Sequence, residues 1–582
     1  MSCIEVMPKL GLTMKEGTIE AWHKKEGEEV KKGEVIFDVT TDKLTNEIEA
    51  KESGVLRKIL VHEGETVECR VPVAIIAGKD EDISNMLKEV GVAGKEEIAE
   101  GKVDNQPLNK TKEKVISKNK NIAIIGGGPG GYIAAIRGAQ LGNNVTLIEK
   151  EELGGTCLNV GCMPTKTLLH SADLFTEIKN SRSLGIDVSE ANINWDNVQK
   201  RKKRVVKKLV AGVKGLLSFN KVKIIKGFAK FESKNSLIVT KEDNKTEKID
   251  FDDAIIASGS VSFMPQIPGI DLDGIIDSTG ALNLKSIPET IAIIGGGIIA
   301  IEFASLFSAL GTKVTILDEE SFILPTVDRQ IADLIGNKLS KQGAEINTGC
   351  KVTKIEKSEK GLKVYFTRKN ENLNVEAEKV LVTVKRCPNT EGLNIEGIGI
   401  NTSNGSICVD DEMKTNVGNI YAIGDCTGKN MFAHAASAEG VVAAENISGQ
   451  GVKMAYKTVP TCVYTKPEIA AVGLTEDEVK EKGIKYKVGV FPMGANGRAM
   501  IFNEQDGIIK IISDEKYGEI LGVHILAPRA TDLIAEGALA LRLEATVDEI
   551  ITTVHAHPTI GEAFKEAALA VYNRALNNVN EK

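Results

Sequence analysis

Two cysteines five positions apart are the first residues in this sequence whose type and spacing could do chemistry. Cys157 and Cys162 lie in the stretch GGTCLNVGCMPTK, residues 154–166. A thiolate is both a nucleophile and a metal ligand, so the pair could bind zinc, form a redox-active disulfide or remain two unreactive thiols. Zinc usually takes four ligands, and neither a second cysteine pair nor a close histidine cluster accompanies this one. We therefore predict no metal site, and the other two possibilities stay open at this point.

A disulfide in this stretch would make a structural demand. Positions i and i+5 of a regular α-helix lie about 8.5 Å apart, whereas a disulfide needs a Cα separation of about 4.4–6.8 Å. A bond therefore requires an interrupted helix between the cysteines. Asn159 and Gly161 tolerate unusual backbone angles, and Pro164 suits a first helical turn. A helix N-terminus and the nearby Lys166 would also favour a thiolate.

Dithiol–disulfide exchange needs a proton acceptor with a pKa near neutral, which histidine supplies. The stretch VHAHPTIGEAFKE contains His555 and His557 among the seven histidines of the chain. Pro558 biases His557 toward an extended backbone. Glu562 follows five positions after His557 and could orient its imidazole, giving a thiol–histidine–carboxylate relay. A histidine buried in the core is the alternative interpretation.

A strand, a glycine-rich turn, a helix and a second strand occur twice, from residues 121 and 290. In such a unit the first glycine makes the tight turn and the second lets the backbone approach a pyrophosphate. The third small residue permits close helix–strand packing, and an acidic residue further on binds a ribose. The helix N-terminus offers free N–H groups to the phosphates. The fingerprint residues are Gly126, Gly128, Gly131 and Glu149 in the first copy and Gly295, Gly297, Ala300 and Asp318 in the second.

Two such units predict two bound dinucleotides, one flavin and one nicotinamide. The first unit directly precedes the cysteine pair, so it is the better place for FAD. The second ends in LDEE, beginning at Leu317, without the arginine that a 2′-phosphate would require. NAD is therefore favoured over NADP at the second site.

Composition excludes several classes of protein. The chain has 582 residues, 42% hydrophobic and 26% charged, with a net charge of −8. This balance gives no basic surface for nucleic acid. We find no run of about 18 apolar residues, so no membrane span is expected, and the N-terminus does not resemble a secretory signal. Nine cysteines at scattered spacings fit a reducing, cytoplasmic location.

With both fingerprints in place, GGTCLNVGCMPTK resembles the redox-active stretch of the class I pyridine nucleotide–disulfide oxidoreductases. The resemblance implies that Cys157 attacks the substrate disulfide or dithiol, while Cys162 lies against the flavin as the charge-transfer thiolate. It also implies that Lys166 sits near the flavin N5, paired with Glu302. The family usually has serine where Thr165 stands.

Two shorter segments carry the same resemblance. YAIGDC around Asp425 resembles the segment that holds the FAD ribityl chain, and IASGS at Ile256–Ser260 resembles the turn that links the FAD and NAD domains. The FAD contacts that the resemblance implies beyond the fingerprint are Lys166, Ala229, Ser258, Gly259, Asp425, Met431 and His434. The corresponding NAD contacts are Glu302, Val352 and Lys385.

The segment HAHPTIGEAF resembles the C-terminal HxxxxE signature of the family, in which the second histidine is catalytic. This assigns the base to His557 and its orienting carboxylate to Glu562. In the family this histidine reaches the flavin site of the other subunit, so a homodimer is implied.

Within the family, PTCVYTKPEIAAVGLTEDE and ILGVHILAPRATDLIAEGALAL look most like the dihydrolipoyl dehydrogenases. A mercuric reductase would have a C-terminal cysteine pair, and a glutathione reductase would have arginines at the second nucleotide site. One departure concerns the motif GRxPN, which is KRCPN here. Lys385 replaces a glycine whose backbone lies close to NAD, so its contact is less secure.

The first 79 residues are similar to a lipoyl domain. Short strand-like runs alternate with turns, and Gly27–Val30 recurs as Gly64–Val67, which predicts a pseudo-symmetric β-sandwich. The stretch TDKLTNEIEA matches the hairpin whose tip lysine carries lipoate, here Lys43. A biotinyl domain would instead centre its lysine between methionines. The usual glycine near Val71 is missing.

The sequence therefore predicts a multidomain chain with a small all-β sandwich, two Rossmann-like α/β domains and a C-terminal α+β domain. The expected boundaries are a lipoyl domain at 1–79, a flexible linker at 80–119, an FAD domain at 120–265 completed by 389–455, an NAD domain at 266–388 and a dimerisation domain at 456–582. The linker is expected because residues 95–120 are charged and nearly free of large apolar side chains.

The predicted activity is oxidation of protein-bound dihydrolipoyl groups by NAD through FAD, with lipoate covalently bound to Lys43. The expected partners are a second subunit and a lipoylated acyltransferase or carrier protein of a 2-oxoacid, acetoin or glycine-cleavage type complex. A lipoyl acyl-carrier or assembly protein, and a flavoprotein reductase of another disulfide, remain alternatives.

Overall fold

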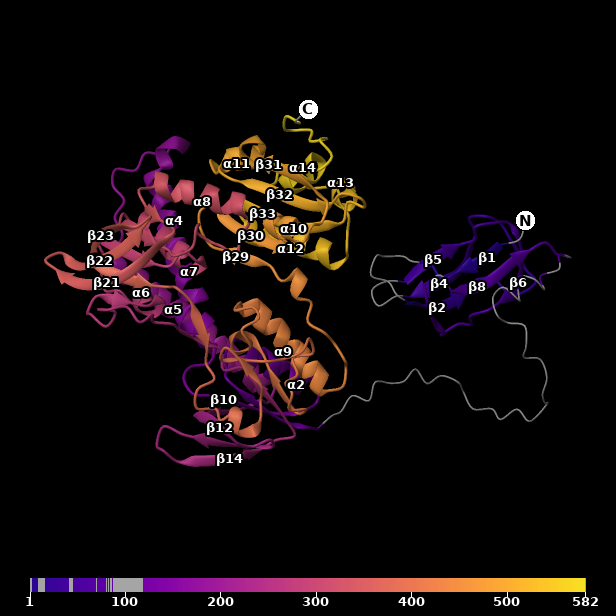
Figure 1. The fold of residues 1–582 in the computed structure, drawn as a ribbon, viewed down its shortest axis with the longest axis horizontal. Coiled ribbons are helices and arrows are strands. Elements are labelled where there is room, and N and C mark those ends of the chain that lie inside the picture. The colour runs from indigo at the N-terminus through magenta and orange to yellow at the C-terminus, as the bar shows by residue number, and fades with distance from the viewer. Residues whose placement is uncertain are drawn as a thin grey trace. The chain divides into compact units, whose positions relative to one another are not determined.

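The protein is described from a computed structural model. It describes residues 3–8, 16–40, 45–69, 71–79, 81, 83, 86 and 119–580. The chain divides into two compact units, residues 1–109 and 110–582 (Figure 1). Lys43 and nearly all of the predicted linker lie outside the described residues.

The N-terminal unit is a sandwich of two four-stranded antiparallel sheets, ordered β1-β8-β6-β3 and β5-β4-β2-β7. Gly27 and Gly64 both have positive φ, 94° and 83°, at the turns before β3 and β7, so the predicted internal repeat is present. Apolar side chains such as Ile19, Phe37 and Leu56 fill the space between the sheets. The strands are β1 (Cys3–Val6), β2 (Glu16–Trp22), β3 (Glu29–Val30), β4 (Val35–Thr40), β5 (Thr45–Glu49), β6 (Gly54–Ile59), β7 (Thr66–Glu68) and β8 (Pro72–Ala77).

The first dinucleotide fold is a five-stranded parallel sheet ordered β11-β10-β9-β15-β28. Its central strands are almost continuously apolar because both faces are covered. β28 enters this sheet from residues 420–422, so a later segment adds a strand to it. Its elements are β9 (Asn121–Ile125), α2 (Pro129–Gln140), β10 (Asn144–Glu149), β11 (Lys223–Lys226), the antiparallel β12 (Phe228–Ser233), β13 (Ser236–Thr240) and β14 (Thr246–Asp250), then β15 (Asp253–Ile256), β26 (Thr402–Ser403), β27 (Ser406–Ile407), β28 (Ile420–Ala422) and α9 (Ala433–Ile447).

The second dinucleotide fold repeats this plan with sheet order β17-β24-β18-β19-β20. A short antiparallel pair, β16 with β25, joins the two dinucleotide folds. The elements are β16 (Ser260–Ser262), β17 (Ile275–Ile276), α6 (Ser278–Leu282), β18 (Thr290–Ile294), α7 (Ile298–Ala309), β19 (Lys313–Leu317), α8 (Arg329–Lys341), β20 (Glu345–Asn347), the antiparallel β21 (Cys350–Ser358), β22 (Gly361–Arg368) and β23 (Glu371–Ala377), then β24 (Lys379–Val382) and β25 (Arg386–Pro388).

The C-terminal part has the predicted α+β composition, an antiparallel sheet β29-β30-β33-β32-β31 with helices packed on it. Phe491 and Phe564 are fully buried between the sheet and α14. The elements are β29 (Thr461–Val463), β30 (Glu468–Gly473), α10 (Glu476–Glu481), β31 (Tyr486–Pro492), α11 (Gly497–Phe502), β32 (Ile508–Asp514), β33 (Ile520–Ala527), α12 (Ala530–Arg542), α13 (Val547–Thr552) and α14 (Glu562–Ala570).

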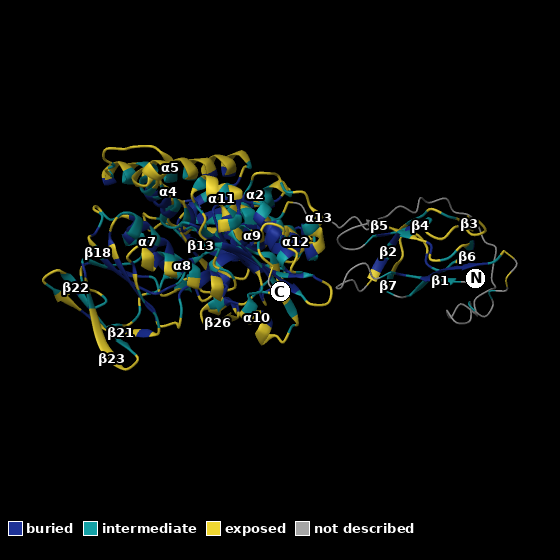
Figure 2. Cartoon of the chain, turned by 90° about the horizontal axis from the view of Figure 1, so that it is seen from above, coloured by how far each residue is buried: buried dark blue, intermediate teal, exposed yellow. Residues whose placement is uncertain are grey.

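Three helices between β10 and β11 carry or support the cysteine stretch. They are α3 (Gly155–Val160), α4 (Cys162–Lys179) and α5 (Trp195–Phe219), and α5 lies on the outside of the unit with an exposed outer side (Figure 2). The 3₁₀ helices are η1 (Ser181–Leu184), η2 (Glu396–Ile398), η3 (Gly424–Thr427), η4 (Tyr456–Thr458) and η5 (Met493–Ala495).

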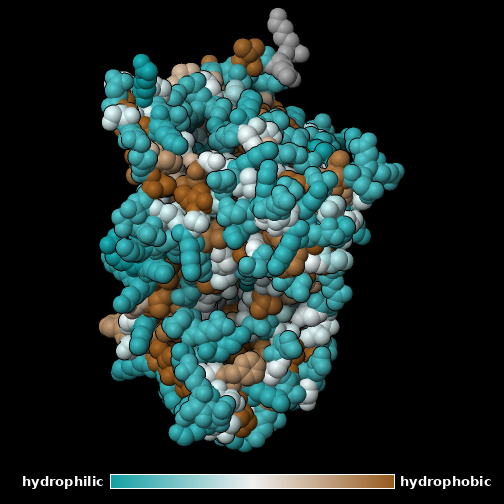
Figure 3. Space-filling view, turned by 90° about the vertical axis from the view of Figure 1, so that its left-hand side faces the viewer, coloured by the Kyte–Doolittle hydropathy of each residue, from teal (hydrophilic) through white to brown (hydrophobic). Residues whose placement is uncertain are grey.

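The surface is mainly polar on the face shown in Figure 3, where hydrophobic side chains are scattered between hydrophilic ones. Within the described residues, every helix is too short or too polar to cross a bilayer.

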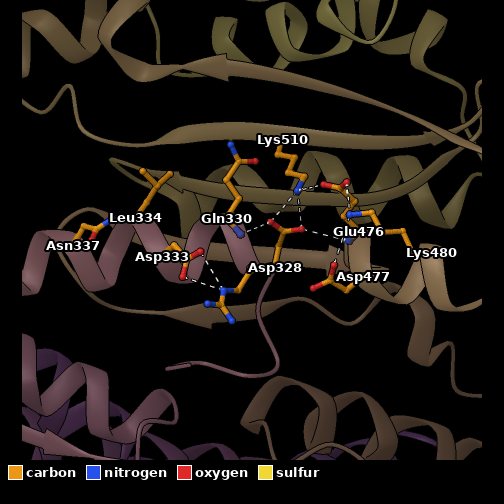
Figure 4. Close-up of a pocket in the computed structure, with 10 residues that line it drawn as sticks. Asp328, Gln330, Asp333, Leu334, Asn337, Glu476, Asp477, Lys480 and Lys510 are labelled. Atoms are coloured by element: carbon orange, nitrogen blue, oxygen red, sulfur yellow. Dashed lines mark hydrogen bonds and ion pairs between the residues drawn. The ribbon is translucent and has the colours of Figure 1, made fainter. Parts of the chain in front are cut away.

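A buried cluster of charges ties the second dinucleotide fold to the C-terminal domain (Figure 4). Lys510 of β32 lies 2.9 Å from an oxygen of Asp328, the N-cap of α8, and 2.7 Å from an oxygen of Glu476 in α10. The side chains of Lys510 and Asp328 are only 3% and 1% exposed. One ammonium group thus balances two carboxylates beside an open pocket that also contains Arg329 and Lys480.

Replacing Lys510 by methionine is expected to destabilise this contact between domains. Breaking a buried ion pair from one side leaves an uncompensated charge and costs about 3–5 kcal/mol. We expect the midpoint of thermal unfolding, measured by calorimetry, to fall by several degrees. Lys480→Met, which removes a half-exposed partner of the same Glu476, is the control and should change the midpoint much less. Equal shifts in both variants would contradict this assignment.

Candidate active site

The helix through the cysteine stretch is interrupted where a disulfide requires it. α3 ends at Val160, Gly161 has φ −141° and ψ −110°, and α4 starts with Cys162. A Cβ added to Gly161 would come within 2.9 Å of the Thr156 carbonyl oxygen, so a side chain does not fit there without a shift. Pro164 lies in the first turn of α4, as predicted.

The two thiols lie close enough to shift each other's pKa, and they are electrostatically unequal. Cys157 is 9% exposed, and Cys162 is half-buried. The hydrogen bond to Cys162 and burial raise the pKa of Cys157 well above its usual range. The hydrogen bond from Cys157, together with Lys166, lowers the pKa of Cys162 to about 7 despite its burial. Cys162 is therefore the more acidic thiol of the two.

Lys166 and Glu302 form the predicted ion pair. The Lys166 Nζ lies 2.7 and 2.8 Å from the two carboxylate oxygens of Glu302. The Glu302 side chain is 5% exposed and also accepts the N–H of Tyr464 at 3.0 Å. The Tyr464 ring lies 4.5 Å from the Lys166 Nζ. Helices α4 and α7 and the residue after β29 thus meet one turn from Cys162.

The first fingerprint has the shape that a pyrophosphate needs. Gly126 has φ 107°, and a Cβ on Gly131 would lie 1.9 Å from the Gly126 carbonyl oxygen, so helix and strand pack as closely as predicted. A Cβ on Gly128 would meet nothing nearer than 3.9 Å, which leaves space beside the start of α2. Glu149 accepts the N–H groups of Gly127 and Glu151 at 2.6 and 2.7 Å. The residues present fit FAD.

Asp425 belongs to a network that sequence reasoning missed. Ser260 donates to an Asp425 carboxylate oxygen, and the Arg386 guanidinium donates to both the hydroxyl and the carbonyl of Ser260, each at 2.7 Å. Arg386 lies in KRCPN and Ser260 is the last residue of IASGS, so both residues belong to motifs that the sequence analysis identified. The sequence did not indicate that the two motifs contact each other across the β16–β25 pair.

The other predicted FAD positions differ in what they present. Ala229 is buried in the domain core, so a nucleotide could contact only its backbone. Gly259 has φ 73°. Met431 is half-exposed, and the His434 Nε2 lies 2.7 Å from the Pro460 carbonyl oxygen. Ser258 offers its carbonyl to Asn389 at 3.1 Å.

The second fingerprint also fits its nucleotide. Gly295 has φ 111°, and a Cβ on Gly297 would meet no atom within 4 Å. Ala300 is fully buried where the helix packs on the strand. The Asp318 carboxyl is buried, which raises its pKa, and its Oδ2 has no hydrogen-bond partner among the described residues. A ribose hydroxyl would satisfy this oxygen.

Two further predicted NAD positions lie near this site. Val352 is buried in the domain core, so its contact would also be through the backbone. Lys385 is exposed and lies two positions after Thr383. The Thr383 N–H donates a hydrogen bond to the carbonyl of Ile294, the last residue of β18, beside the fingerprint. Its Nζ lies 4.4 Å from the Phe263 ring.

Replacing Asp318 by alanine is expected to raise the KM for NAD⁺ at least about tenfold, because a hydrogen bond to a charged group contributes about 1.5–3 kcal/mol. Initial rates with NAD⁺ varied at a saturating concentration of the reducing substrate measure this. The exposed neighbour Glu319, changed to glutamine, is the control. An unchanged KM in the Asp318 variant would remove this residue from the site.

His557 and His555 are distinguished by their hydrogen bonds. The His557 Nδ1 lies 2.8 Å from a Glu562 oxygen, its side chain is 80% exposed, and its Nε2 makes no hydrogen bond within residues 119–580. His555 is 9% exposed and uses both ring nitrogens, with Thr553 and Glu536. Burial opposes the shift, but the Thr559 N–H and His557 lower the pKa of Glu562, which keeps it ionised. His557 is therefore the histidine with a free nitrogen.

The structure does not bring His557 to the cysteines of the same chain. Within residues 119–580 no hydrogen bond joins His557 to Cys157 or Cys162. In the described part of the chain, no three His, Cys, Asp or Glu side chains converge as metal ligands.

Two dinucleotide folds, a cysteine pair at the start of a helix and an antiparallel C-terminal domain define a flavoprotein disulfide reductase. Residues 120–440 match the family described as pyridine nucleotide-disulphide oxidoreductase, and residues 459–568 match the dimerisation domain of that family. Residues 6–76 match a third family, described as biotin-requiring enzyme. The chain belongs to the pyridine nucleotide-disulphide oxidoreductase family and carries an N-terminal lipoyl domain.

Individual proteins agree with this assignment. The chain is 43% identical over 447 residues to the dihydrolipoyl dehydrogenase of Geobacillus stearothermophilus, covering 76% of this chain and 94% of that protein. It is 42% identical over 468 residues to the mitochondrial dihydrolipoyl dehydrogenase of Pisum sativum, covering 79% and 93%. The structure resembles LpdA from Mycobacterium tuberculosis, with TM-score 0.72, 28% identity and coverage of 77% and 99%. It also resembles the HOCl-induced flavoprotein disulfide reductase RclA from Escherichia coli in its Cu(II) complex, with TM-score 0.70, 31% identity and coverage of 78% and 99%.

The predicted fold class, enzyme class and cofactors are thereby confirmed. The chain is a flavoprotein disulfide oxidoreductase that uses FAD and NAD. The individual site residues stay predictions, which the geometry described above supports.

Proposed function

We propose that this enzyme is a dihydrolipoyl dehydrogenase that oxidises protein-bound dihydrolipoyl groups and reduces NAD⁺ to NADH. The observation that carries the proposal is the cysteine pair at the helix interruption, beside the Lys166–Glu302 ion pair, where the pKa of Cys157 is raised and that of Cys162 is lowered. The similarity to dihydrolipoyl dehydrogenases over most of their length supports the substrate class. The N-terminal lipoyl domain supports it independently.

The exchange step follows from this inequality. One substrate thiol, deprotonated by His557 of a second copy, attacks the Cys157 Sγ, and the S–S bond to Cys162 breaks. Cys162 is the better leaving group because its pKa is lower. The second substrate thiol then attacks the substrate sulfur of the mixed disulfide, which closes the lipoyl disulfide and releases Cys157. The Cys157 thiolate takes the first proton from His557, and the proton of the second substrate thiol passes to His557. The substrate loses two electrons and two protons, and the pair becomes one thiol and one thiolate, with the second proton on His557.

The chain's own residues would hold both cofactors. Glu149 and the open space beside Gly128 suit FAD, and Asp318 and the open space beside Gly297 suit NAD. Bound FAD would supply a two-electron acceptor beside the cysteine pair, and bound NAD⁺ would supply a hydride acceptor. The Lys166 ammonium, held in place by Glu302, lies one helical turn from Cys162 and lowers its pKa.

The proposed working unit is a homodimer, because His557 is solvent-facing and is not bonded to the cysteines of its own chain, and because the chain has the family's dimerisation domain. The proposed partners are lipoylated acyltransferase or carrier proteins of a 2-oxoacid, acetoin or glycine-cleavage type complex. Lys43 is the proposed lipoate attachment site. The proposal keeps the cytoplasmic location that the scattered cysteines favour.

The proposal is tested by mixing the FAD-loaded enzyme anaerobically with dihydrolipoamide and NAD⁺ in a stopped-flow instrument. We expect flavin reduction followed by NADH formation, and much slower reduction of glutathione disulfide or thioredoxin disulfide by NADH. Flavin that stays oxidised with dihydrolipoamide would refute the proposal. Intact mass after expression with lipoate tests Lys43, with Lys43→Arg as the unmodified control.

A further inference from the structure

Helix α5 carries a concentration of positive charge that the active-site chemistry does not use. Its 25 residues include eight lysines and arginines and one acidic residue, Asp196, although the whole chain has a net charge of −8. Two of the eight bond to the protein itself, because Lys202 is buried against the Leu282 carbonyl and Arg201 donates to the Thr167 carbonyl at 3.2 Å. The other six lysines and arginines make no such contact among the residues that the structure describes, so their concentration on one helix is not explained by the fold.

These six side chains form one surface, which we call the basic face of α5. All six are exposed, and steps of three, four and seven residues place them opposite the buried side of the helix. That buried side includes Trp195, Val213 and Leu217. The basic face consists of Lys200, Lys203, Arg204, Lys207, Lys208 and Lys214.

The basic face has no counter-charge within residues 119–580. No ion pair or hydrogen bond to a carboxylate involves any of its six cations. Like charges three and four positions apart on a helix repel each other. An acidic partner would relieve this repulsion, and Figure 2 shows the outer side of α5 exposed along the edge of the unit.

The basic face lies beside the redox site. α5 packs against both α3 and α4, and Val213 and Leu217 share one core cluster with Cys157. Arg201 reaches the carbonyl of Thr167, about 7.5 Å along α4 from Cys162 by helical rise. A protein docked on the basic face would therefore stand next to the helices that hold the cysteines.

The lipoyl domain carries the opposite charge on one sheet. The strands of sheet β5-β4-β2-β7 contain six acidic residues and no lysine or arginine. Glu16 and Glu68 are directly opposite each other in the β2–β7 pair, where like charges also repel. The strands β4 and β5 of this sheet are joined by residues 41–44, which include Lys43. We call the sheet β5-β4-β2-β7 the acidic sheet. Its acidic residues are Glu16, Glu20, Asp38, Glu47, Glu49 and Glu68.

We propose that the basic face of α5 is the docking surface for the acidic sheet of a lipoyl domain supplied by a second copy of this chain. The inference rests on the proposed function, since it names how the protein-bound dithiol is recognised. Complementary charge accelerates encounter and orients the partner, and the effect weakens with salt. The segment that carries Lys43, which connects β4 and β5, then arrives beside α3 and α4 with its sheet already oriented.

The test uses two partners in trans. The enzyme is the full FAD-loaded chain with Lys43→Arg, so that its own lysine carries no lipoate. The substrate is the lipoylated, reduced domain of residues 1–79, a separate compact unit with its own apolar core. Free dihydrolipoamide is the second substrate, because it has no acidic sheet. We compare the enzyme with and without Lys203→Glu, Arg204→Glu and Lys207→Glu.

We expect these three changes to lower kcat/KM for the lipoyl domain at least about tenfold, and kcat/KM for free dihydrolipoamide by less than twofold. The matched control carries the same charge change at three exposed lysines of β21 and its turn, as Lys351→Glu, Lys357→Glu and Lys360→Glu. A lipoyl domain with Glu16→Lys, Glu47→Lys and Glu68→Lys should recover most of the lost rate with the α5 variant and should react slowly with the unmodified face.

Three results would overturn the inference. One is an equal loss in the α5 and β21 variants, and another is an equal loss with both substrates. The third is retention of a DNA oligonucleotide by the basic face, in a mobility assay, with domain kinetics unchanged, which would make the helix a nucleic-acid surface. Chemical-shift changes of the labelled lipoyl domain, on addition of each enzyme variant, measure docking without turnover. They separate a failed docking surface from a failed dihydrolipoyl dehydrogenase assignment.

Discussion

Replacing Cys157 by serine is expected to lower NADH formation from dihydrolipoamide by at least about 10³-fold. The serine hydroxyl cannot form the mixed disulfide that carries electrons from the substrate, and removing a nucleophile costs factors of this size or larger. The hydrogen bond that stabilises the Cys162 thiolate is also altered, since the donor in the structure is the Cys157 thiol. Steady-state rates with saturating NAD⁺ measure the loss.

Two measurements separate this chemical loss from misfolding. Oxidation of NADH by ferricyanide does not need the substrate-facing thiol, so the Cys157→Ser enzyme should keep most of that activity. Cys387→Ser is the matched control, because Cys387 is half-buried in β25 and outside the pair. A Cys157→Ser enzyme that oxidises dihydrolipoamide within tenfold of the unmodified enzyme would show that another group accepts the substrate.

Much of this fold could be predicted because its signals are local. Each fingerprint lies within about thirty residues, and the strand, turn and helix it predicts are there, with Gly126 and Gly295 both at positive φ. The interruption at Gly161 also followed from a local argument, the helical separation of positions five apart. The glycine repeat in the lipoyl domain is of the same kind, since Gly27 and Gly64 mark equivalent turns.

Contacts between distant segments could not be predicted in this way. The Lys510 cluster joins residues 182 and 34 positions apart, and a lysine in an apolar strand gave no sign of its partners. The contact of Arg386 with Ser260 spans 126 positions. A sequence pattern shows that a buried charged side chain requires a partner of opposite charge or a hydrogen bond. Which residue provides that partner depends on how the domains pack.

The resemblance placed residues near the cofactors without saying how they act. Ala229 and Val352 are buried in domain cores, so their side chains would not face a nucleotide. Lys385 shows the converse, since the departure from glycine was visible in the sequence but its contact with Phe263 was not. In each case the surroundings of the side chain, burial for Ala229 and Val352 and the Phe263 ring for Lys385, determine whether it can contact a nucleotide.

Replacing His557 by glutamine is expected to lower kcat with dihydrolipoamide by about 10²–10⁴-fold, the usual contribution of a positioned general base. Glutamine keeps a polar side chain of similar length but cannot accept a proton near neutral pH. Glu562→Gln should cause a smaller loss, because it removes only the carboxylate 2.8 Å from Nδ1. His555→Gln is the control, since both nitrogens of His555 are already bonded within the chain. A larger loss in the His555 variant would reverse the assignment.

The subunit that supplies the base can be decided by mixing the two inactive enzymes. A heterodimer of Cys157→Ser and His557→Gln chains has one site with both defects and one with neither, if the histidine comes from the other chain. Subunit exchange, measured with differently tagged chains, should then restore up to half the activity per purified heterodimer. If His557 served its own chain, each site would keep one defect and activity would stay at the level of the parents. The exposed side chain of His557 and the absence of a bond to the cysteines within residues 119–580 favour restored activity.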